Sequence, residues 1–224
     1  MFTGNANSML VHNLSKNNTI LNQFIAELRD KTIQKDSMRF RRNIERIGEI
    51  FAYEISSRFD YSAENIQTPL AETLIKLPNY QLVIASILRA GIPLHQGLLN
   101  YLDQAESAFI SAYRKYESET KFKIAIEYAA SPDLTGKTLI LADPMLASGK
   151  SMYNAYKSLT AKAKTKKIHL ICIFAAPEGI AYLKEHINEE VELWVGVIDE
   201  KLNKHSYIIP GLGDAGDLAY GEKV

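Results

Sequence analysis

The sequence predicts an α/β fold, in which a doubly wound, mainly parallel sheet is flanked by helices. From residue 82 onward, short apolar runs alternate with amphipathic stretches, which is typical of βαβ units. One of these runs, 138–142, ends in an acid and precedes a loop of small residues. With 224 residues, 46% of them hydrophobic, the chain is long enough to bury a sizeable core. We therefore expect a single domain that spans residues 1–224.

The N-terminal part, residues 1–60, is expected to add helices to this domain. Residues 1–13 are polar and mixed, which predicts a poorly ordered start or an arm. Apolar side chains recur at helical spacing between Thr19 and Arg29. They recur again after Asp36, a residue type favoured at helix N-caps.

Four arginines follow one another along this second helix: Arg39, Arg41, Arg42 and Arg46. A solvated helix face is the simpler interpretation, and an interface or an anion-facing surface is the alternative. The polar residues 60–68 predict a loop after the helix.

The alternating part of the chain extends to residue 197. We expect strands at 82–87, 107–114, 123–130, 138–142, 168–174 and 191–197, and helices at 92–102, 151–163 and 178–186. The strands 107–114 and 123–130 follow each other without a helix, so they are expected to form a hairpin flap. Because ligands of doubly wound sheets bind beyond the carboxyl ends of the strands, the residues that follow strands are the candidates for a site.

Charge and cysteine content narrow the function classes. Lys and Arg number 26, as do Asp and Glu, so the formal net charge is zero, which argues against binding nucleic acid through bulk positive charge. The single Cys172 lies in an apolar run, which indicates a buried structural thiol and fits a reducing compartment. Neither a membrane span nor a signal peptide is recognisable. We expect a cytoplasmic protein without membrane or nucleic-acid partners.

The segment from Asp143 to Ser151 is the first candidate site. A strand, a loop and a helix in succession present backbone N–H groups to a phosphate at the helix N-terminus. Asp143 offers an acceptor for hydroxyls or a hydrated metal ion, and Gly149 permits close approach of the backbone. Pro144 stands where the kinase P-loop pattern requires Gly, so a nucleotide kinase is not favoured. An ordinary βα turn remains the alternative for this loop.

Two arginines are candidates for a diphosphate. Arg89 belongs to the segment 88–93, which directly follows the strand 82–87, and it precedes a small residue and Gly91. Its guanidinium offers a bidentate fork to phosphate oxygens. Arg114, near the end of the strand 107–114, is the second candidate.

The C-terminal segment from Tyr207 to Asp217 is the third candidate site. It contains three Gly, one Pro and two Asp, which predicts an ordered loop without regular helix or strand. Backbone N–H and C=O groups of such a loop pair well with a flat heterocyclic amide such as a pyrimidine. Asp214 and Asp217 are candidates for a metal ion or a proton transfer. A loop that merely folds over the core is the alternative.

Taken together, these segments resemble the uracil phosphoribosyltransferases of the type I phosphoribosyltransferase superfamily. The family's phosphate loop, D-P-M-L-A-T-G-G-S, is matched by 143–151, its L-R-A-G by 88–91, its Y-R pair by 113–114 and its C-terminal signature by 207–217. Ser148 stands where the family usually has Thr, and Lys150 where it usually has Gly. If that position required a positive φ, Lys150 would be strained by about 1 kcal/mol or more.

The resemblance implies transfer of the 5-phosphoribosyl group from phosphoribosyl pyrophosphate to N1 of uracil, giving UMP and pyrophosphate in pyrimidine salvage. It implies Mg²⁺ as cofactor, held mainly by phosphoribosyl pyrophosphate and through water by Asp214. It also implies a homodimer or larger homo-oligomer, and some members of the family bind GTP as an activator.

The resemblance also implies roles for individual residues. The catalytic residues would be Asp214, Arg114 and Asp143. Phosphoribosyl pyrophosphate would contact Arg89, Arg114, Asp143, Pro144, Met145, Leu146, Ala147, Ser148, Gly149, Lys150, Ser151 and Asp214. Uracil would be bound within residues 198–224 by Ile208, Gly213, Asp214 and Ala215.

Two other functions are compatible with the same fold. One is a non-catalytic nucleotide sensor or RNA-binding regulator, which the zero net charge and the lack of a Lys/Arg-rich stripe disfavour. The other is a phosphoribosyltransferase with a purine or orotate acceptor, which the C-terminal segment disfavours.

Overall fold

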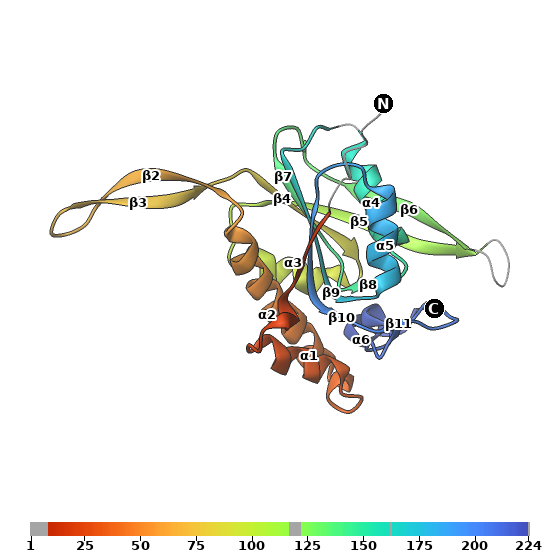
Figure 1. The fold of residues 1–224 in the computed structure, drawn as a ribbon. Coiled ribbons are helices and arrows are strands. Elements are labelled where there is room, and N and C mark those ends of the chain that lie inside the picture. Colours follow the sequence, from red (N-terminus) through yellow and green to blue (C-terminus); the bar gives the residue numbers. More distant parts are fainter. Residues whose placement is uncertain (1–8, 117–121, 162, 224) are drawn as a thin grey trace.

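The structure, a computed structural model, describes residues 9–116, 122–161 and 163–223. For 112–116 and 122–127 it describes the backbone but not the side chains. Its centre is an eight-stranded sheet of order β1-β10-β9-β7-β4-β5-β6, with β8 paired to β9 (Figure 1). The strands are β1 (Leu10–Asn13), β4 (Leu82–Leu88), β5 (Glu106–Tyr116), β6 (Phe122–Ala130), β7 (Thr138–Ala142), β8 (Met145–Leu146), β9 (Lys167–Ala175) and β10 (Glu192–Ile198).

Helices cover both faces of this sheet. The helices α1 (Leu21–Arg29), α2 (Ser37–Ser56) and α3 (Gly91–Leu99) lie on one face, and α4 (Lys150–Thr160) and α5 (Pro177–His186) lie on the other (Figure 1). Alternate strand residues divide the core: Ile84 and Ile140 pack with α1 to α3, whereas Val83 and Leu139 pack with α4 and α5. Every strand pair of the sheet is parallel except β5–β6. The predicted fold class is confirmed.

The four arginines of α2 all have partners within the chain. Asp36 caps the helix as expected, because its side chain accepts from the N–H of Arg39 at 3.1 Å. The arginine contacts are Arg39–Glu27, Arg41 to the carbonyl of Ala219, Arg42–Glu45 and Arg46–Asn43. The contacts of Arg39 and Arg41 tie α2 to α1 and to the C-terminal segment, whereas Arg42 and Arg46 bind residues of α2 itself. The side chains of Arg39 and Arg42 are 48% and 45% exposed, so the helix face is partly solvated.

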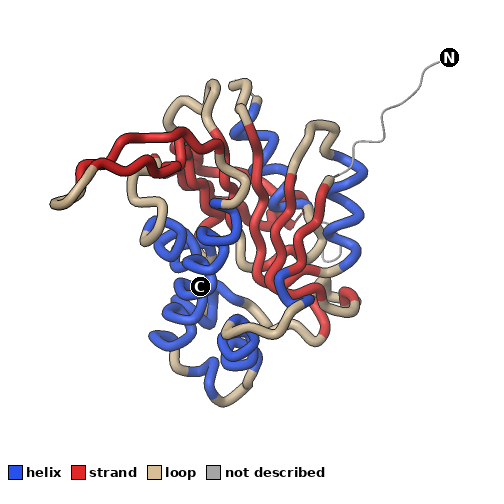
Figure 2. Tube along the Cα trace, turned by 60° about the vertical axis from the view of Figure 1, so that its left-hand side comes forward, coloured by secondary structure: helices blue, strands red, loops and turns tan. Residues whose placement is uncertain are grey.

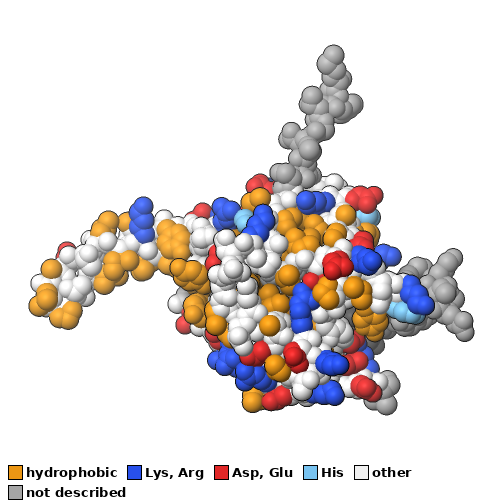
Figure 3. Space-filling model, turned by 60° about the horizontal axis from the view of Figure 1, so that its bottom comes forward, with side chains coloured by type: hydrophobic (Ala, Val, Ile, Leu, Met, Phe, Trp, Pro, Cys, Tyr) orange, Lys and Arg blue, Asp and Glu red, His pale blue; other side chains and the backbone are white. Residues whose placement is uncertain are grey.

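The prediction of a loop at residues 60–68 is wrong. A separate hairpin of β2 (Asp60–Gln67) and β3 (Glu72–Asn79) projects from the body (Figures 1 and 2). All of β3 is exposed, so its apolar side chains stand in solvent, as the space-filling view shows on the projecting arm (Figure 3). Because neither face of the hairpin packs on the core, the sequence lacks the alternation that marks a half-buried strand.

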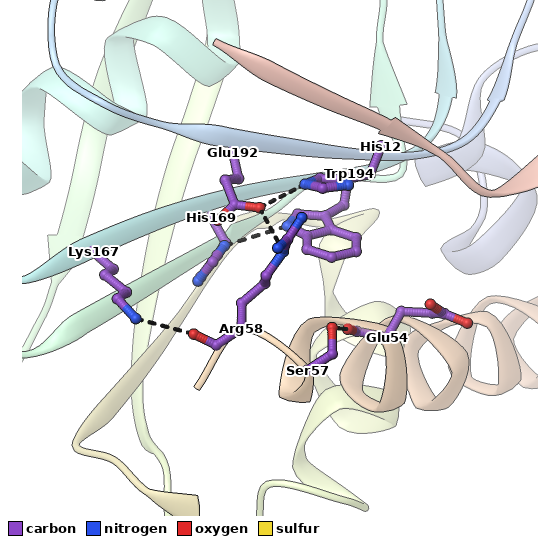
Figure 4. Close-up of polar contacts among 8 residues, drawn as sticks. All are labelled: His12, Glu54, Ser57, Arg58, Lys167, His169, Glu192 and Trp194. Atoms are coloured by element: carbon purple, nitrogen blue, oxygen red, sulfur yellow. Dashed lines mark hydrogen bonds and ion pairs between the residues drawn. The ribbon is translucent and has the colours of Figure 1, made fainter. Parts of the chain in front are cut away.

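The poorly ordered start or arm predicted for residues 1–13 is wrong for residues 10–13, which form the edge strand β1 in parallel with β10. Residues 1–8 of that prediction lie outside the described residues. His12 stacks on Trp194 with ring centroids 3.9 Å apart, and its Nε2 lies 2.5 Å from Oε2 of Glu192 (Figure 4). Arg58, after α2, approaches the same oxygen with Nε at 3.3 Å. A four-residue strand has too little periodicity to be recognised, and its partner lies 180 residues away.

Cys172 is fully buried in β9, and burial raises the pKa of its thiol, with a smaller contribution from the charge of Asp143. The interpretation of a structural thiol is therefore confirmed. Within the described residues, no helix combines the length and the apolar character required to cross a bilayer.

Candidate active site

The three candidate segments meet at one edge of the sheet. Asp143 follows β7, Arg89 follows β4, and the C-terminal segment lies beyond the end of β10 (Figure 1). This edge is formed by the carboxyl ends of parallel strands, where ligands of doubly wound sheets bind. Segments that lie more than a hundred residues apart in the chain therefore share one site.

The phosphate loop ends in a helix N-terminus without a side-chain cap. Gly149 is the N-cap residue of α4, with a φ of 78°. A Cβ there would lie 2.8 Å from the carbonyl oxygen of Gly179, so both the conformation and the available space require glycine. The first N–H groups of a helix have no partner within the helix and attract anions. This loop can therefore receive a phosphate group.

Lys150 is not strained. It is the first residue of α4, and Ser206 is the only non-glycine residue with a positive φ in the described part of the chain. The positive φ of the loop falls on Gly149 instead. The strain considered for a lysine at this position therefore does not arise.

The start of helix α5 packs against the backbone of the phosphate loop. The N–H of Ala176 donates to the carbonyl of Leu146 at 2.9 Å. A Cβ at Gly179 would lie 2.4 Å from the carbonyl oxygen of Ala147 and 2.9 Å from that of Leu146. The loop backbone thus rests directly on the first turn of α5, and a glycine is required at the contact.

Gly179→Ala should weaken binding of phosphoribosyl pyrophosphate, the substrate that the resemblance implies, more than binding of the acceptor. The added methyl group should push the carbonyls of Leu146 and Ala147 out of place, and with them the neighbouring N–H groups of the loop. We expect the KM for phosphoribosyl pyrophosphate to rise by about tenfold. Steady-state kinetics with each substrate varied in turn measure this. A KM that rises equally for both substrates would contradict a local effect on the loop.

Two carboxylates, those of Asp143 and Asp214, interact through their charges. The pKa of Asp143 is raised to about 7, mainly by burial and to a smaller extent by the charge of Asp214, while a hydrogen bond from the N–H of Met145 opposes the rise. That N–H donates to Oδ1 of Asp143 at 3.2 Å. Asp143 and Asp214 are therefore close enough to sense each other's charge.

The donor set fits a hydrated magnesium ion held mainly by substrate phosphates. Among the described side chains, no three His, Cys, Asp or Glu converge on a common point. Mg²⁺ commonly binds through one or two carboxylates together with phosphate oxygens and water. Asp143 and Asp214 supply two such carboxylates beside the phosphate loop.

Arg89 joins the strand end to the C-terminal segment. The Leu88–Arg89 peptide bond is cis. Nη2 of Arg89 donates to Oδ1 of Asp217 at 2.9 Å and to the carbonyl of Gly221 at 3.1 Å. Asp217, one of the two acids considered for a metal ion or proton transfer, is thus the ion-pair partner of this arginine.

Arg114 lies in β5, where its backbone pairs with Ile124 of β6. Its side chain is outside the described part of the structure. The role expected for Arg114 in binding diphosphate therefore stays a prediction.

The C-terminal segment is more regular than expected. Ile208 and Ile209 form β12, which pairs with β11 (Lys201–Leu202), and the short helix α6 (Ala215–Tyr220) begins within the segment. The prediction of a segment without regular structure is therefore wrong at both ends. Between these elements, Gly213 is exposed with a φ of 101°, and a Cβ there would meet open space.

Asp214 caps helix α6. Its Oδ1 accepts from the N–H groups of Gly216 at 2.9 Å and Asp217 at 3.0 Å. Ile208 and Ala215 are buried, whereas Gly213 between them is exposed. The arrangement offers backbone donors and acceptors next to a carboxylate.

Two residues beside this segment escaped the sequence reasoning. The buried side chain of Asp199 and the guanidinium of Arg29 both bind the backbone of Gly211. Asp199 is an acid directly after the strand β10, the same signal that singled out Asp143. No local pattern marks Arg29, because its contacts lie about 170 residues away in the sequence.

Comparison with known proteins identifies the family. The family model described as uracil phosphoribosyltransferase matches residues 15–222. The chain belongs to the uracil phosphoribosyltransferase family. The match includes the phosphate loop, Arg89 and the C-terminal segment.

Individual uracil phosphoribosyltransferases agree with this assignment. The chain is 50% identical over 216 residues to the uracil phosphoribosyltransferase of Porphyromonas gingivalis, covering 96% of this chain and all of that protein. It is 40% identical over 195 residues to that of Methanococcus vannielii, covering 86% of this chain and 83% of that protein. The solved structure of the AQ2163 protein from Aquifex aeolicus superimposes with a TM-score of 0.85 at 28% identity, covering 96% of this chain and all of that one.

Proposed function

We propose that this chain carries out the reaction of its family as a single domain. It transfers the 5-phosphoribosyl group of phosphoribosyl pyrophosphate to N1 of uracil and yields UMP and pyrophosphate. The observation that carries the proposal is the meeting of a phosphate-accepting helix N-terminus, the acids Asp143 and Asp214, and a segment with exposed backbone groups at one sheet edge.

Each part has a role in substrate binding. The backbone of 144–151, with the hydroxyls of Ser148 and Ser151, holds the 5′-phosphate through charge-assisted hydrogen bonds. Asp143 accepts from the ribose hydroxyls. Backbone groups of Ile208, Gly213 and Ala215 bind the edge of uracil, and Asp214 contacts phosphoribosyl pyrophosphate or its hydrated magnesium ion.

Charge stabilisation on the leaving group accounts for the catalysis. As the bond from C1 to pyrophosphate breaks, positive charge develops on the ribose and negative charge on the pyrophosphate. Arg89 and Arg114 stabilise that negative charge. A guanidinium carries five N–H donors, so Arg89 can bind a phosphate without releasing Asp217. When bound, Mg²⁺ neutralises further charge on the pyrophosphate.

An acceptor assay tests this function. The purified chain is incubated with phosphoribosyl pyrophosphate, Mg²⁺ and one acceptor at a time: uracil, orotate or hypoxanthine. We expect pyrophosphate release and an equal amount of UMP with uracil alone. Release with orotate or hypoxanthine instead would assign another acceptor. RNA binding without any turnover would favour the regulator.

We further propose a cytoplasmic homo-oligomer. The unpaired Cys172 supports a reducing compartment.

Support for the oligomer comes from the projecting β2–β3 hairpin (Figure 3), since a two-stranded hairpin on its own is marginally stable in water. Its exposed apolar side chains are Tyr61, Leu70, Leu74, Ile75 and Leu77. We propose that a second copy of this chain packs against these exposed side chains.

Charged residues on the hairpin should dissociate the oligomer. Leu70 is 96% exposed and Leu74 is 66% exposed, so neither substitution disturbs the core. We expect the double variant Leu70→Asp, Leu74→Asp to sediment as a smaller species than the unaltered chain. Met38→Asp, at a 64% exposed position on α2, is the matched control and should sediment normally. Identical sedimentation of all three proteins would argue against the hairpin as the interface.

A further inference from the structure

The turn that carries Gly211 is held on both sides by two charged residues from distant elements. Oδ2 of Asp199 accepts from the N–H of Gly211 at 3.0 Å. Nη1 of Arg29 donates to the carbonyl of Gly211 at 3.0 Å and to Oδ2 of Asp199 at 3.1 Å. Nη2 of Arg29 binds the other carboxylate oxygen of Asp199. Both polar backbone groups of this peptide position are thus engaged.

Asp199 and Arg29 are each held in place by further contacts. The side chain of Asp199 is only 4% exposed, and its N–H donates to the carbonyl of Ala175, at the end of β9, at 2.8 Å. Arg29 ends helix α1, and its guanidinium lies 4.7 Å from the ring centroid of Phe174. The pair therefore links the Gly211 turn to the ends of β9 and β10 and to helix α1.

The location of Gly211 gives the contact its significance. Gly211 lies between Ile208 and Gly213, whose backbone groups are proposed to bind uracil. Its φ is 56°, and a Cβ would lie 2.2 Å from the carbonyl oxygen of Ile208. A shift of Gly211 would therefore displace the carbonyl of Ile208 on one side and the backbone of Gly213 on the other.

We propose that Arg29 and Asp199 are positioning residues for the nucleobase, acting through the backbone of Gly211. This inference rests on the proposed function, because it assigns the turn to the uracil half of the site. Neither residue touches the phosphate loop in the contacts described above. Their loss should therefore act on uracil and leave phosphoribosyl pyrophosphate binding intact.

The test compares two variants of this pair with a matched control. Arg29→Lys keeps the charge but lacks the fork that binds Asp199 and Gly211 together. Asp199→Asn removes the charge that Arg29 neutralises. Arg39→Lys alters the corresponding ion pair between α1 and α2, in which Arg39 binds the 7% exposed Glu27 at 2.8 Å, away from the C-terminal segment. Folding of each protein is checked by its thermal transition.

The KM for each substrate and the dissociation constant of UMP are then measured. We expect the KM for uracil to rise by about tenfold in Arg29→Lys and more in Asp199→Asn, with the KM for phosphoribosyl pyrophosphate changed by less than about twofold. UMP should bind more weakly in proportion, and Arg39→Lys should behave like the unaltered chain. If Asp199→Asn does not fold, the KM values of Arg29→Lys alone decide whether the pair positions the nucleobase.

The two proposals fail in different ways. An unchanged KM for uracil in folded Arg29→Lys, or an equal rise in both KM values, would overturn the positioning role while the unaltered chain still turns over uracil. No turnover of uracil by the unaltered chain would instead contradict the proposed function.

Discussion

Asp143→Asn should lower kcat/KM for phosphoribosyl pyrophosphate by at least about 100-fold and at the same time stabilise the fold at alkaline pH. A carboxylate accepts hydrogen bonds at both oxygens, whereas an amide accepts at only one, so the ribose hydroxyls lose an acceptor. Oδ1 of an asparagine can still accept from the N–H of Met145, so the local backbone should be retained.

The sign of the stability effect follows from the raised pKa of Asp143, about 7 in the folded chain. The unfolded chain releases this proton near pH 3.9, as an ordinary aspartate does. Between these values the folded state binds more protons than the unfolded state. Stability is therefore fully present below the unfolded pKa and is lost as pH rises through the folded pKa. Asparagine does not ionise, so the variant avoids this loss.

Thermal unfolding at pH 5 and pH 8 measures the effect. The Tm of Asp143→Asn should exceed that of the unaltered chain most at pH 8, by about 2–4 °C for each kcal/mol relieved. In the unaltered chain, kcat/KM for phosphoribosyl pyrophosphate should also fall as pH drops below about 7, the pKa of Asp143. Glu185→Gln, which removes the charge of a 79% exposed carboxylate on α5, is the control for both measurements. A Tm at pH 8 that is lower in Asp143→Asn than in the unaltered chain would show that the ionised carboxylate does not destabilise the fold.

Asp214→Asn and Asp214→Ala should both lower turnover by at least about tenfold, but only the alanine should destabilise the chain. Asp214 caps α6 by accepting from the N–H groups of Gly216 and Asp217. Asparagine is an equally good cap, whereas alanine costs about 0.5–2 kcal/mol. The asparagine variant therefore isolates the loss of charge from the loss of the cap.

The asparagine variant also tests the interaction between the two acids. Because the charge of Asp214 contributes to the raised pKa of Asp143, its removal should shift the acid limb of the pH profile to lower pH. Asp36→Ala is the matched control, since Asp36 caps α2 by accepting from the N–H of Arg39. It should lower the Tm without changing turnover. Equal turnover in Asp214→Asn and the unaltered chain would remove Asp214 from the catalytic residues.

The central sheet and its helices were predictable because their sequence signals are local. Buried parallel strands are continuous apolar runs, as in β4 and β7, and the cap at Asp36 is readable from neighbouring residues. The β2–β3 hairpin and β1 were not predictable, because neither follows a buried alternation. One projects from the body, and the other is completed by β10 from the far end of the chain.

The sequence alone predicted the fold class, the candidate phosphate loop and, through the family resemblance, the acceptor, because each of these signals lies in short contiguous segments. The tertiary structure decided that the positive φ of the loop falls on Gly149 rather than Lys150 and that Asp217 pairs with Arg89. It also raised the pKa of Asp143 by burial and placed Arg29 and Asp199 on Gly211. These features depend on distances between residues far apart in the chain, which only the packing of the sheet and helices sets.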